Sequence, residues 1–244
     1  MKLPKVVIGI PTYNGKSYCE DQFFECVINL NYPKKLLAIL VIDNSTDEGK
    51  YARTLQEKYP NFKIIHQSSN EVVYKRLFNS HETIRKEFLK TPAKFLLHLE
   101  SDVLIPKDTI QRLLRARKSV VSPVYNLSLG VNRHIVQRNR QWGMPFGGKY
   151  SWGYTYGTAH QSFLDGTVKK VQTSGIGCIL VHRSIMKAVP FRYRPDVDAA
   201  PDSAFATDLL LKGIDNFCDT SFLVNHANGD DWGSGNTTKL EKYE

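Results

Sequence analysis

Glu100 and Asp102 are two carboxylates that stand two residues apart, directly after the apolar run Phe95–Leu99. Successive side chains of an extended chain point to opposite faces, so we expect both acids on one side and Ser101 on the other. Neighbouring carboxylates repel each other unless a positive charge lies between them, and their oxygens are ligands that Mg²⁺ and Mn²⁺ prefer. The pair therefore predicts a divalent-metal site; a solvated strand end that caps the next helix is the alternative.

The run that carries these acids is short, is flanked by Pro92 and Pro106, and has no helical period. Such a run is typical of a buried strand in a parallel sheet. Ligands of open α/β sheets bind just beyond the carboxyl ends of the strands. The sequence therefore predicts that Glu100 and Asp102 lie where a ligand binds.

Three further apolar runs, Val6–Ile10, Leu37–Ile42 and Phe62–His66, predict strands, and apolar residues at helical spacing lie between them. Strands that alternate with helices are typical of βαβ units and a parallel sheet. We therefore expect one α/β domain with a Rossmann-like, mainly parallel sheet flanked by helices. A smaller antiparallel part is expected from Val120 onward.

Several local features follow from turn and capping residues. We expect Ser45 or Thr46 to cap the helix after the second strand, and residues 70–76 to form a loop. Residues 171–181 predict a strand broken by the glycines of Ser174–Gly177, which suggest close approach by a ligand or another backbone. Residues 201–213 predict a helix with Asp202 at its N-cap and Gly213 beyond its end.

Polar residues follow the ends of the predicted strands. Besides the two acids, the strand ends offer Thr12, Tyr13, Asn14, Asp43 and Asn44. The chain has neither a Gly-x-Gly-x-x-Gly fingerprint nor a Gly-Lys-Ser/Thr loop, which argues against dinucleotide-binding and P-loop proteins. A crevice with these side chains can hydrogen-bond a base and a ribose and leave the phosphates to a metal ion.

Composition narrows the possible partners and setting. The net charge of +9 favours anionic partners, but it is spread along the chain without a long basic run, which argues against nucleic acid. The four cysteines form no Cys-x-x-Cys pair and are not at zinc-site spacing. Because neither a signal peptide nor a transmembrane run is visible, we expect a reducing, cytoplasmic setting.

The segment Gln141–Thr158 is rich in glycine and aromatic residues. Glycines permit mobility, and aromatic faces stack on sugar rings or bases, so a binding loop is one interpretation. An aromatic β-hairpin packed on the edge of the sheet is the other. The polar tail from Asn228 to Glu244 is expected to be a loose arm or a lid.

Six stretches, taken together and in order, resemble family 2 glycosyltransferases of the GT-A fold. They are Pro11-Thr12-Tyr13-Asn14, Val41–Asp47, Glu100-Ser101-Asp102, Gly175–Arg183, the Asp202-x-x-Phe205 helix and His226. The resemblance covers most of the chain. It implies a single glycosyltransferase domain with a nucleotide-binding half over residues 1–105, an acceptor-binding half over residues 106–227 and a tail over residues 228–244.

The resemblance implies an inverting enzyme that moves a sugar from a nucleotide-diphosphate sugar, most often a UDP-sugar, to an acceptor hydroxyl. It implies that Thr12, Tyr13 and Asp43 hold the base, and that Asp202 is the catalytic base with Asp198 in reserve. The metal ligands, for Mn²⁺ or Mg²⁺, would be Asp102 and His226 together with Glu100, which stands near the ribose or the metal. The nucleotide would also contact Pro11, Asn14, Asn44, Arg76, Ser101 and Gly175. The acceptor would be a glycan, a lipid-linked group or a protein group. A peripheral contact with a membrane surface is compatible with the resemblance.

The sequence departs from the family pattern at three positions. Glu100 replaces the first Asp of the usual Asp-x-Asp, Pro201 replaces the acid before the base, and Asp208 stands where a helix arginine is common.

Two other functions stay open. A nucleotidyltransferase would share the nucleotide-binding half of the fold and the acidic metal ligands. Its phosphate-binding loop, however, is usually rich in Gly and Lys, unlike Pro11–Lys16. A non-catalytic glycan- or nucleic-acid-binding module would explain the aromatic residues and the charge, but not Asp102, Asp202 and His226 at the places that the family predicts.

Overall fold

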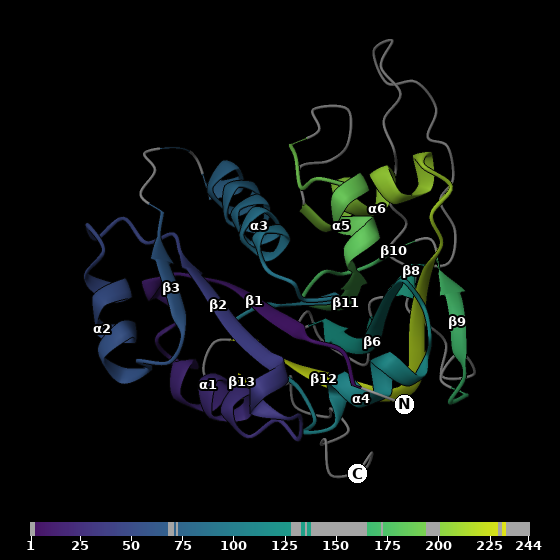
Figure 1. Cartoon of the computed structure of the whole chain (residues 1–244), viewed down its shortest axis with the longest axis horizontal. Helices are drawn as coiled ribbons and strands as arrows, with labels where there is room; N and C mark the ends of the chain where they lie inside the picture. The colour runs from purple at the N-terminus through teal and green to yellow at the C-terminus, as the bar shows by residue number, and fades with distance from the viewer. Residues whose placement is uncertain are drawn as a thin grey trace.

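The computed structural model describes residues 3–67, 71, 73–127, 133–134, 136–137, 165–171, 173–193, 201–228 and 231–232 (Figure 1). The aromatic segment Gln141–Thr158, the reserve base Asp198 and nearly all of the tail lie outside the described residues, so the predictions for them stay predictions.

The first half of the chain forms the parallel part of the sheet. Its strands are β1 (Val6–Thr12), β2 (Leu37–Asp43), β3 (Lys63–His66) and β4 (Phe95–Leu99), in the spatial order β3-β2-β1-β4. Strand β1 pairs in parallel with both β2 and β4. The four strands therefore end at one edge of the sheet, where the polar residues after each strand can meet.

The second half extends the same sheet with mixed pairings. Strand β11 (Cys178–His182) runs antiparallel to β4 and to β6 (Val120–Leu127), and the long β12 (Asn216–Asn228) runs parallel to β6. Strands β5 (Val103–Leu104), β9 (Val168–Val171) and β13 (Asp231–Trp232) pair antiparallel with β12. The short strands are β7 (Arg133–His134), β8 (Val136–Gln137) and β10 (Thr173–Ser174). The predicted fold class, a mainly parallel sheet with antiparallel strands after Val120, is confirmed.

Helices cover both faces of the sheet. The apolar cluster on one face includes residues of α1 (Glu20–Ile28), α2 (Lys50–Lys58) and α4 (Thr109–Arg115); the other includes residues of α3 (Val73–Lys90), α5 (Arg183–Ala188) and α6 (Pro201–Leu211). Figure 1 shows α3, α5 and α6 together on one side. Two 3₁₀ turns, η1 (Asn14–Lys16) and η2 (Lys34–Leu36), follow β1 and precede β2.

Strand alternation divides the core between these faces. In β4, Leu97 and Leu99 belong to the α1 side, whereas Leu96 belongs to the α3 side. Gly9 of β1 allows α3 to approach closely, because a Cβ atom at that position would lie 2.3 Å from Cγ2 of Ile84. The packing thus fixes α3 firmly against the strands that end at the polar edge.

Helix α2 is not capped by Ser45 or Thr46, so that prediction is wrong. The helix begins later, after Gly49 in the left-handed conformation with φ 78°, and the Asp47 carboxylate accepts a 3.0 Å hydrogen bond from the Tyr51 amide. The Ser45 hydroxyl instead accepts a hydrogen bond from an amide of the β1 loop. The segment after β2 is therefore held by its own polar side chains before the helix starts.

Three other local predictions need correction. The loop predicted over residues 70–76 is shorter, because α3 already begins at Val73. Residues 171–181 do not form one interrupted strand; they contribute to β9, β10 and β11, and β10 pairs with β8 outside the main sheet. Helix α6 begins at Pro201, which favours the first helical position, so Asp202 lies in the first turn and not at the N-cap. Gly213 follows the helix with φ 65°, as predicted.

Candidate active site

A cavity of about 360 Å³ opens at the carboxyl ends of β1, β2 and β4. Most of the residues predicted to bind a nucleotide line it: Pro11, Thr12, Tyr13, Asn44, Arg76, Glu100 and Ser101. Asp102, Lys16 and Leu77 complete the lining. The strand ends therefore form one polar cleft, as the parallel sheet requires.

Helix α3 fixes the wall of this cleft beside β2. The Asn44 side-chain amide donates to the Ser80 hydroxyl at 3.0 Å, and Arg76 Nη1 donates to the Asn44 carbonyl at 3.3 Å. The Asn44 amide donates to the Thr12 carbonyl at 2.9 Å. These bonds join the ends of β1 and β2 to the first turns of α3, so the cleft lining is held in place without a ligand.

The structure brings the three predicted metal ligands together. One ligand atom from each of Glu100, Asp102 and His226 lies within 4.8 Å of the other two. His226 reaches the site because β12 pairs with β5 opposite Val103 and the Ala227 amide donates to the Asp102 carbonyl at 2.7 Å. His226 Nε2 then lies 3.6 Å from Asp102 Oδ2.

The reason why Glu100 and Asp102 converge differs from the one predicted. Both residues lie after the end of β4, and the Val103 amide donates to the Glu100 carbonyl at 3.1 Å, which closes a turn. The Glu100 amide donates to the Gly177 carbonyl at 2.8 Å, which ties the turn to the glycine segment after β10. A turn, and not the alternation of an extended strand, therefore holds the two acids together.

Lys16 is a second cation of the cleft beside Arg76, and the sequence reasoning missed it. Its ammonium forms an ion pair with Asp102 Oδ2, and the side chain of Asp102 is only 9% exposed. Burial by itself lowers the pKa of Lys16, but the Asp102 carboxylate outweighs burial and raises that pKa. The sequence offered one signal for Lys16, namely its position in the turn directly after β1, at the edge of the sheet where ligands bind. Lys16 is thus fully charged and neutralises part of the acid cluster.

Negative charge is crowded at this point. Burial, followed by the charges of Asp102 and Asp202, raises the pKa of Glu100 well above the usual range, and Lys16 opposes that rise. Asp202 therefore lies close enough to act on Glu100, although it comes from the first turn of α6. Two carboxylates and one imidazole are a suitable ligand set for Mn²⁺ or Mg²⁺, and the imidazole favours Mn²⁺. The residues present fit a divalent cation.

Asp43 does not line the cleft. It is fully buried beneath it, where Oδ1 accepts from the Ser45 amide at 2.9 Å and Oδ2 pairs with His66 Nδ1 at 2.8 Å. The Ser45 hydroxyl in turn accepts from the Asn14 amide at 2.8 Å. Asp43, predicted from the resemblance to hold the base, is thus occupied with bracing the loops of β1 and β2.

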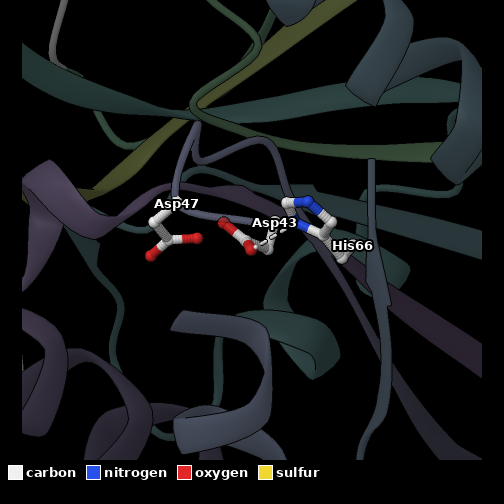
Figure 2. A group of neighbouring side chains, drawn as sticks. All are labelled: Asp43, Asp47 and His66. Carbon is white, nitrogen blue, oxygen red and sulfur yellow. Dashed lines mark hydrogen bonds and ion pairs between the residues drawn. The ribbon is translucent and has the colours of Figure 1, made fainter. Parts of the chain in front are cut away.

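Asp43, Asp47 and His66 form a second group whose ligand atoms lie within 4.8 Å of one another. Figure 2 shows Asp43 between the other two side chains. The group differs from the first because Asp47 caps α2 and both oxygens of Asp43 already accept hydrogen bonds. These hydrogen bonds hold the end of β2 to β3 and to the start of α2.

The remaining site predictions have different positions. Gly175 is buried beside β11, and Asn14 takes part through its backbone amide, so neither lines the cleft. Asp208, at the position where the family has an arginine, is 3% exposed and accepts two hydrogen bonds from Arg192, at 2.8 and 3.0 Å. A guanidinium is therefore present next to α6, but it comes from another segment.

Comparison with known proteins rests on the fold. No family model and no curated protein matches this sequence. Among solved structures, GalNAc-T7 with UDP, GalNAc and Mn²⁺ aligns with a TM-score of 0.65 at 12% identity, over 99% of this chain and 48% of that chain. The mannosyltransferase PcManGT from Pyrobaculum calidifontis, in complex with GDP-Man and Mn²⁺, aligns with a TM-score of 0.53 at 16% identity, over 84% of this chain and 51% of that chain.

The chain has the GT-A fold. S. aureus TarS aligns as well, with a TM-score of 0.56 at 19% identity, over 88% of this chain and 34% of its own. This chain therefore spans between about a third and a half of the length of these three structures. Among its described residues, no helix combines the length and apolar character needed to cross a bilayer.

Proposed function

We propose that this GT-A protein is a glycosyltransferase that moves a sugar from a nucleotide-diphosphate sugar to an acceptor hydroxyl. The observation that carries the proposal is the convergence of Glu100, Asp102 and His226 at the end of the cleft, with Asp202 beside them. Two of the similar structures support it, because one holds UDP and Mn²⁺ and the other holds GDP-Man and Mn²⁺.

The donor's base and ribose would lie against Thr12, Tyr13 and Asn44. Tyr13 is 43% exposed and offers a ring face, while the backbone of Asn44 is fixed by Thr12 and Arg76. Asp43 would support this wall from beneath through Ser45. The preference for a uridine diphosphate donor rests on the family resemblance, and it is part of the proposal.

Asp102 and His226, with Glu100 beside them, would hold a divalent cation, Mn²⁺ in preference to Mg²⁺. Such an ion supplies Lewis-acid neutralisation of the charge that grows on a diphosphate leaving group. Lys16 must release Asp102 when the cation binds, and its ammonium is then free to pair with the diphosphate. The chain would thus supply positive charge to the leaving group from two sides.

Asp202 would accept the proton of the acceptor hydroxyl. A single base on the side of the sugar opposite the leaving group gives displacement with inversion. Its place in the first turn of α6 favours the ionised form, because a helix N-terminus stabilises negative charge. Asp198 is the reserve candidate for this role.

We also propose a cytoplasmic setting with peripheral contact at a membrane surface. All four cysteines are free thiols, and three of them are buried, which suits a reducing compartment. The acceptor would be a glycan, a lipid-linked or a protein group.

The test is release of nucleoside diphosphate from a panel of UDP- and GDP-sugars with Mn²⁺, repeated in excess chelator. We expect turnover of a UDP-sugar that stops in chelator. Full activity in chelator would contradict the metal requirement. Turnover of GDP-sugars alone would contradict the proposed preference for a uridine diphosphate donor. Release of pyrophosphate from a nucleoside triphosphate and a sugar phosphate would indicate a nucleotidyltransferase instead. Glycan binding without any turnover would indicate a binding module.

Asp202→Asn tests the base. If Asp202 is the base, nucleotide binding and thermal stability should hold while transfer falls by roughly 10²–10⁴-fold. Loss of the favourable helix-end charge should cost only about 0.3–1 kcal/mol of stability. A variant with the wild-type transfer rate would move the base to another carboxylate, with Asp198 the first to examine.

A further inference from the structure

A second, larger concavity lies at the opposite end of the sheet. It has a volume of about 920 Å³ and is built where β1 and β4 begin, with Leu3 and Pro4 before β1 and Lys94 before β4. The segment after α4 and His182 at the end of β11 close it. Strand β1 has seven residues, so roughly 20 Å separate this basic groove from the catalytic cleft.

The rim of the basic groove carries four full positive charges: Lys94, Arg115, Arg117 and Lys118. Among the described residues no carboxylate pairs with any of them, and none lines the groove. The pKa of His182 is lowered by burial and then by the charge of Lys94, which is the response expected in a positive field. The groove therefore concentrates cations that no carboxylate among the described residues neutralises.

The walls between these cations are apolar. Leu3 is 40% exposed, and Pro4, Phe95 and Leu114 contribute further apolar surface. The Phe95 ring packs edge-to-face on His182, with the ring centroids 5.1 Å apart, so one side of this aromatic is already covered. An occupant that matches this groove must combine negative charge with apolar surface.

We propose that the basic groove docks this protein on membranes by binding the headgroups of anionic phospholipids. Phosphate groups would pair with the rim cations, and Leu3 and Leu114 would contact the upper part of the acyl chains. Nucleic acid fits less well. Proteins hold single strands by stacking the bases on exposed aromatic faces, and they read duplexes with a protruding helix or β-ribbon that enters a groove of the DNA. Charge complementarity together with aliphatic walls favours the lipid.

The inference gives the membrane contact proposed above a location, and it does not depend on the transfer chemistry. Because the groove and the cleft lie at opposite ends of β1 and β4, docking would leave the cleft open to the aqueous side. Of the proposed acceptors, a glycan or a protein group would then reach the cleft from solution, roughly 20 Å from the lipid surface.

Vesicle sedimentation tests the groove. The full chain should bind vesicles of phosphatidylcholine mixed with phosphatidylglycerol and not vesicles of phosphatidylcholine alone. In the double variant Lys94→Gln/Arg117→Gln, partitioning should fall by about 30-fold, since each cation near an anionic surface contributes about fivefold. In the double variant Arg115→Gln/Lys118→Gln, partitioning should fall by the same factor as in the first double variant. The matched control is Lys50→Gln/Lys75→Gln, two exposed lysines on α2 and α3 that lose the same charge; its partitioning should change less than about twofold.

Three outcomes would overturn the proposal. They are equal binding to neutral vesicles, equal losses in the groove and control variants, and displacement from vesicles by inorganic phosphate or single-stranded DNA at concentrations too low to act by screening. Nucleoside diphosphate release in the absence of vesicles should be the same in all variants. That readout separates failure of the groove from failure of the proposed glycosyltransferase activity, and equal thermal unfolding midpoints confirm that each variant is folded.

Discussion

Lys16→Met should tighten the binding of Mn²⁺ to the protein in the absence of nucleotide. In the structure the Lys16 ammonium is paired with Asp102 Oδ2, the same oxygen that lies 3.6 Å from His226 Nε2. A divalent cation can use this oxygen only after the ion pair has opened. Methionine has a similar length and no charge, so it removes the competitor and leaves the three ligands in place.

The expected gain follows from the strength of that contact. A hydrogen bond to a charged group contributes about 1.5–3 kcal/mol to stability. The Coulomb attraction of a pair near a protein surface, about 4 kcal/mol at 4 Å, is an upper limit because desolvation opposes it. The Lys16 side chain is 25% exposed, so solvent screens part of the attraction. We therefore expect the dissociation constant for Mn²⁺ to fall by about 10- to 100-fold.

Calorimetric titration with Mn²⁺ measures this change. The matched control is Lys63→Met, which removes the ion pair with Glu87, 2.7 Å away on another surface, and should leave the affinity unchanged. If Lys16→Met binds Mn²⁺ no more tightly than the wild type, Lys16 does not compete for the metal ligands. A weaker affinity would show that Lys16 supports the site instead of occupying it.

Three further predictions concern the site and its support. Asp102→Asn should lose detectable Mn²⁺ binding in the same titration while thermal stability is largely kept, because the backbone carbonyl still accepts from Ala227; retained affinity would contradict the assigned ligand. Gly9→Ala should lower the free energy of unfolding by about 1–3 kcal/mol, since the new methyl group meets Ile84 at 2.3 Å; an unchanged urea midpoint would contradict the close approach. Stability should also fall on acidification from about pH 6.5 towards pH 4, because burial lowers the pKa of His98 to about 4 and lowers that of its partner His81 as well. In that range the unfolded chain binds protons that the folded chain does not, so each histidine contributes a loss of up to about 1.4 kcal/mol per pH unit, and a flat profile of urea midpoints would refute it.

Much of the nucleotide-binding half was predictable because its signals are local. Each strand of the parallel part is a short apolar run bounded by polar residues or prolines, and the carboxyl ends of such strands must meet at one edge. The predicted places of Thr12, Asn44 and Glu100 on the cleft follow from that rule alone. The glycine at position 213 also placed the end of α6 correctly.

What the sequence could not give depends on contacts between distant segments. The carboxylate of Asp43 points beneath the cleft because Ser45 and His66 each bind one of its oxygens, and His66 belongs to another strand. The cap of α2 moved to Asp47 because Ser45 was already engaged. In both cases a polar side chain had several chemically reasonable partners, and only tertiary packing selected one.

Carboxylates gather at the cleft although the chain as a whole carries a net positive charge. The charges of Asp102 and Asp202 both act on Glu100, which lines the cleft of a protein whose net charge is +9. A diphosphate could not approach such a group unless positive charge were supplied there, and among the described lining residues Lys16 and Arg76 supply two charges. Lys16 is paired with Asp102 in this structure, so the proposed divalent cation would supply further positive charge for the proposed donor. The crowding of carboxylates that raises the pKa of Glu100 is therefore the same feature that supports a divalent ion as the partner of the proposed donor.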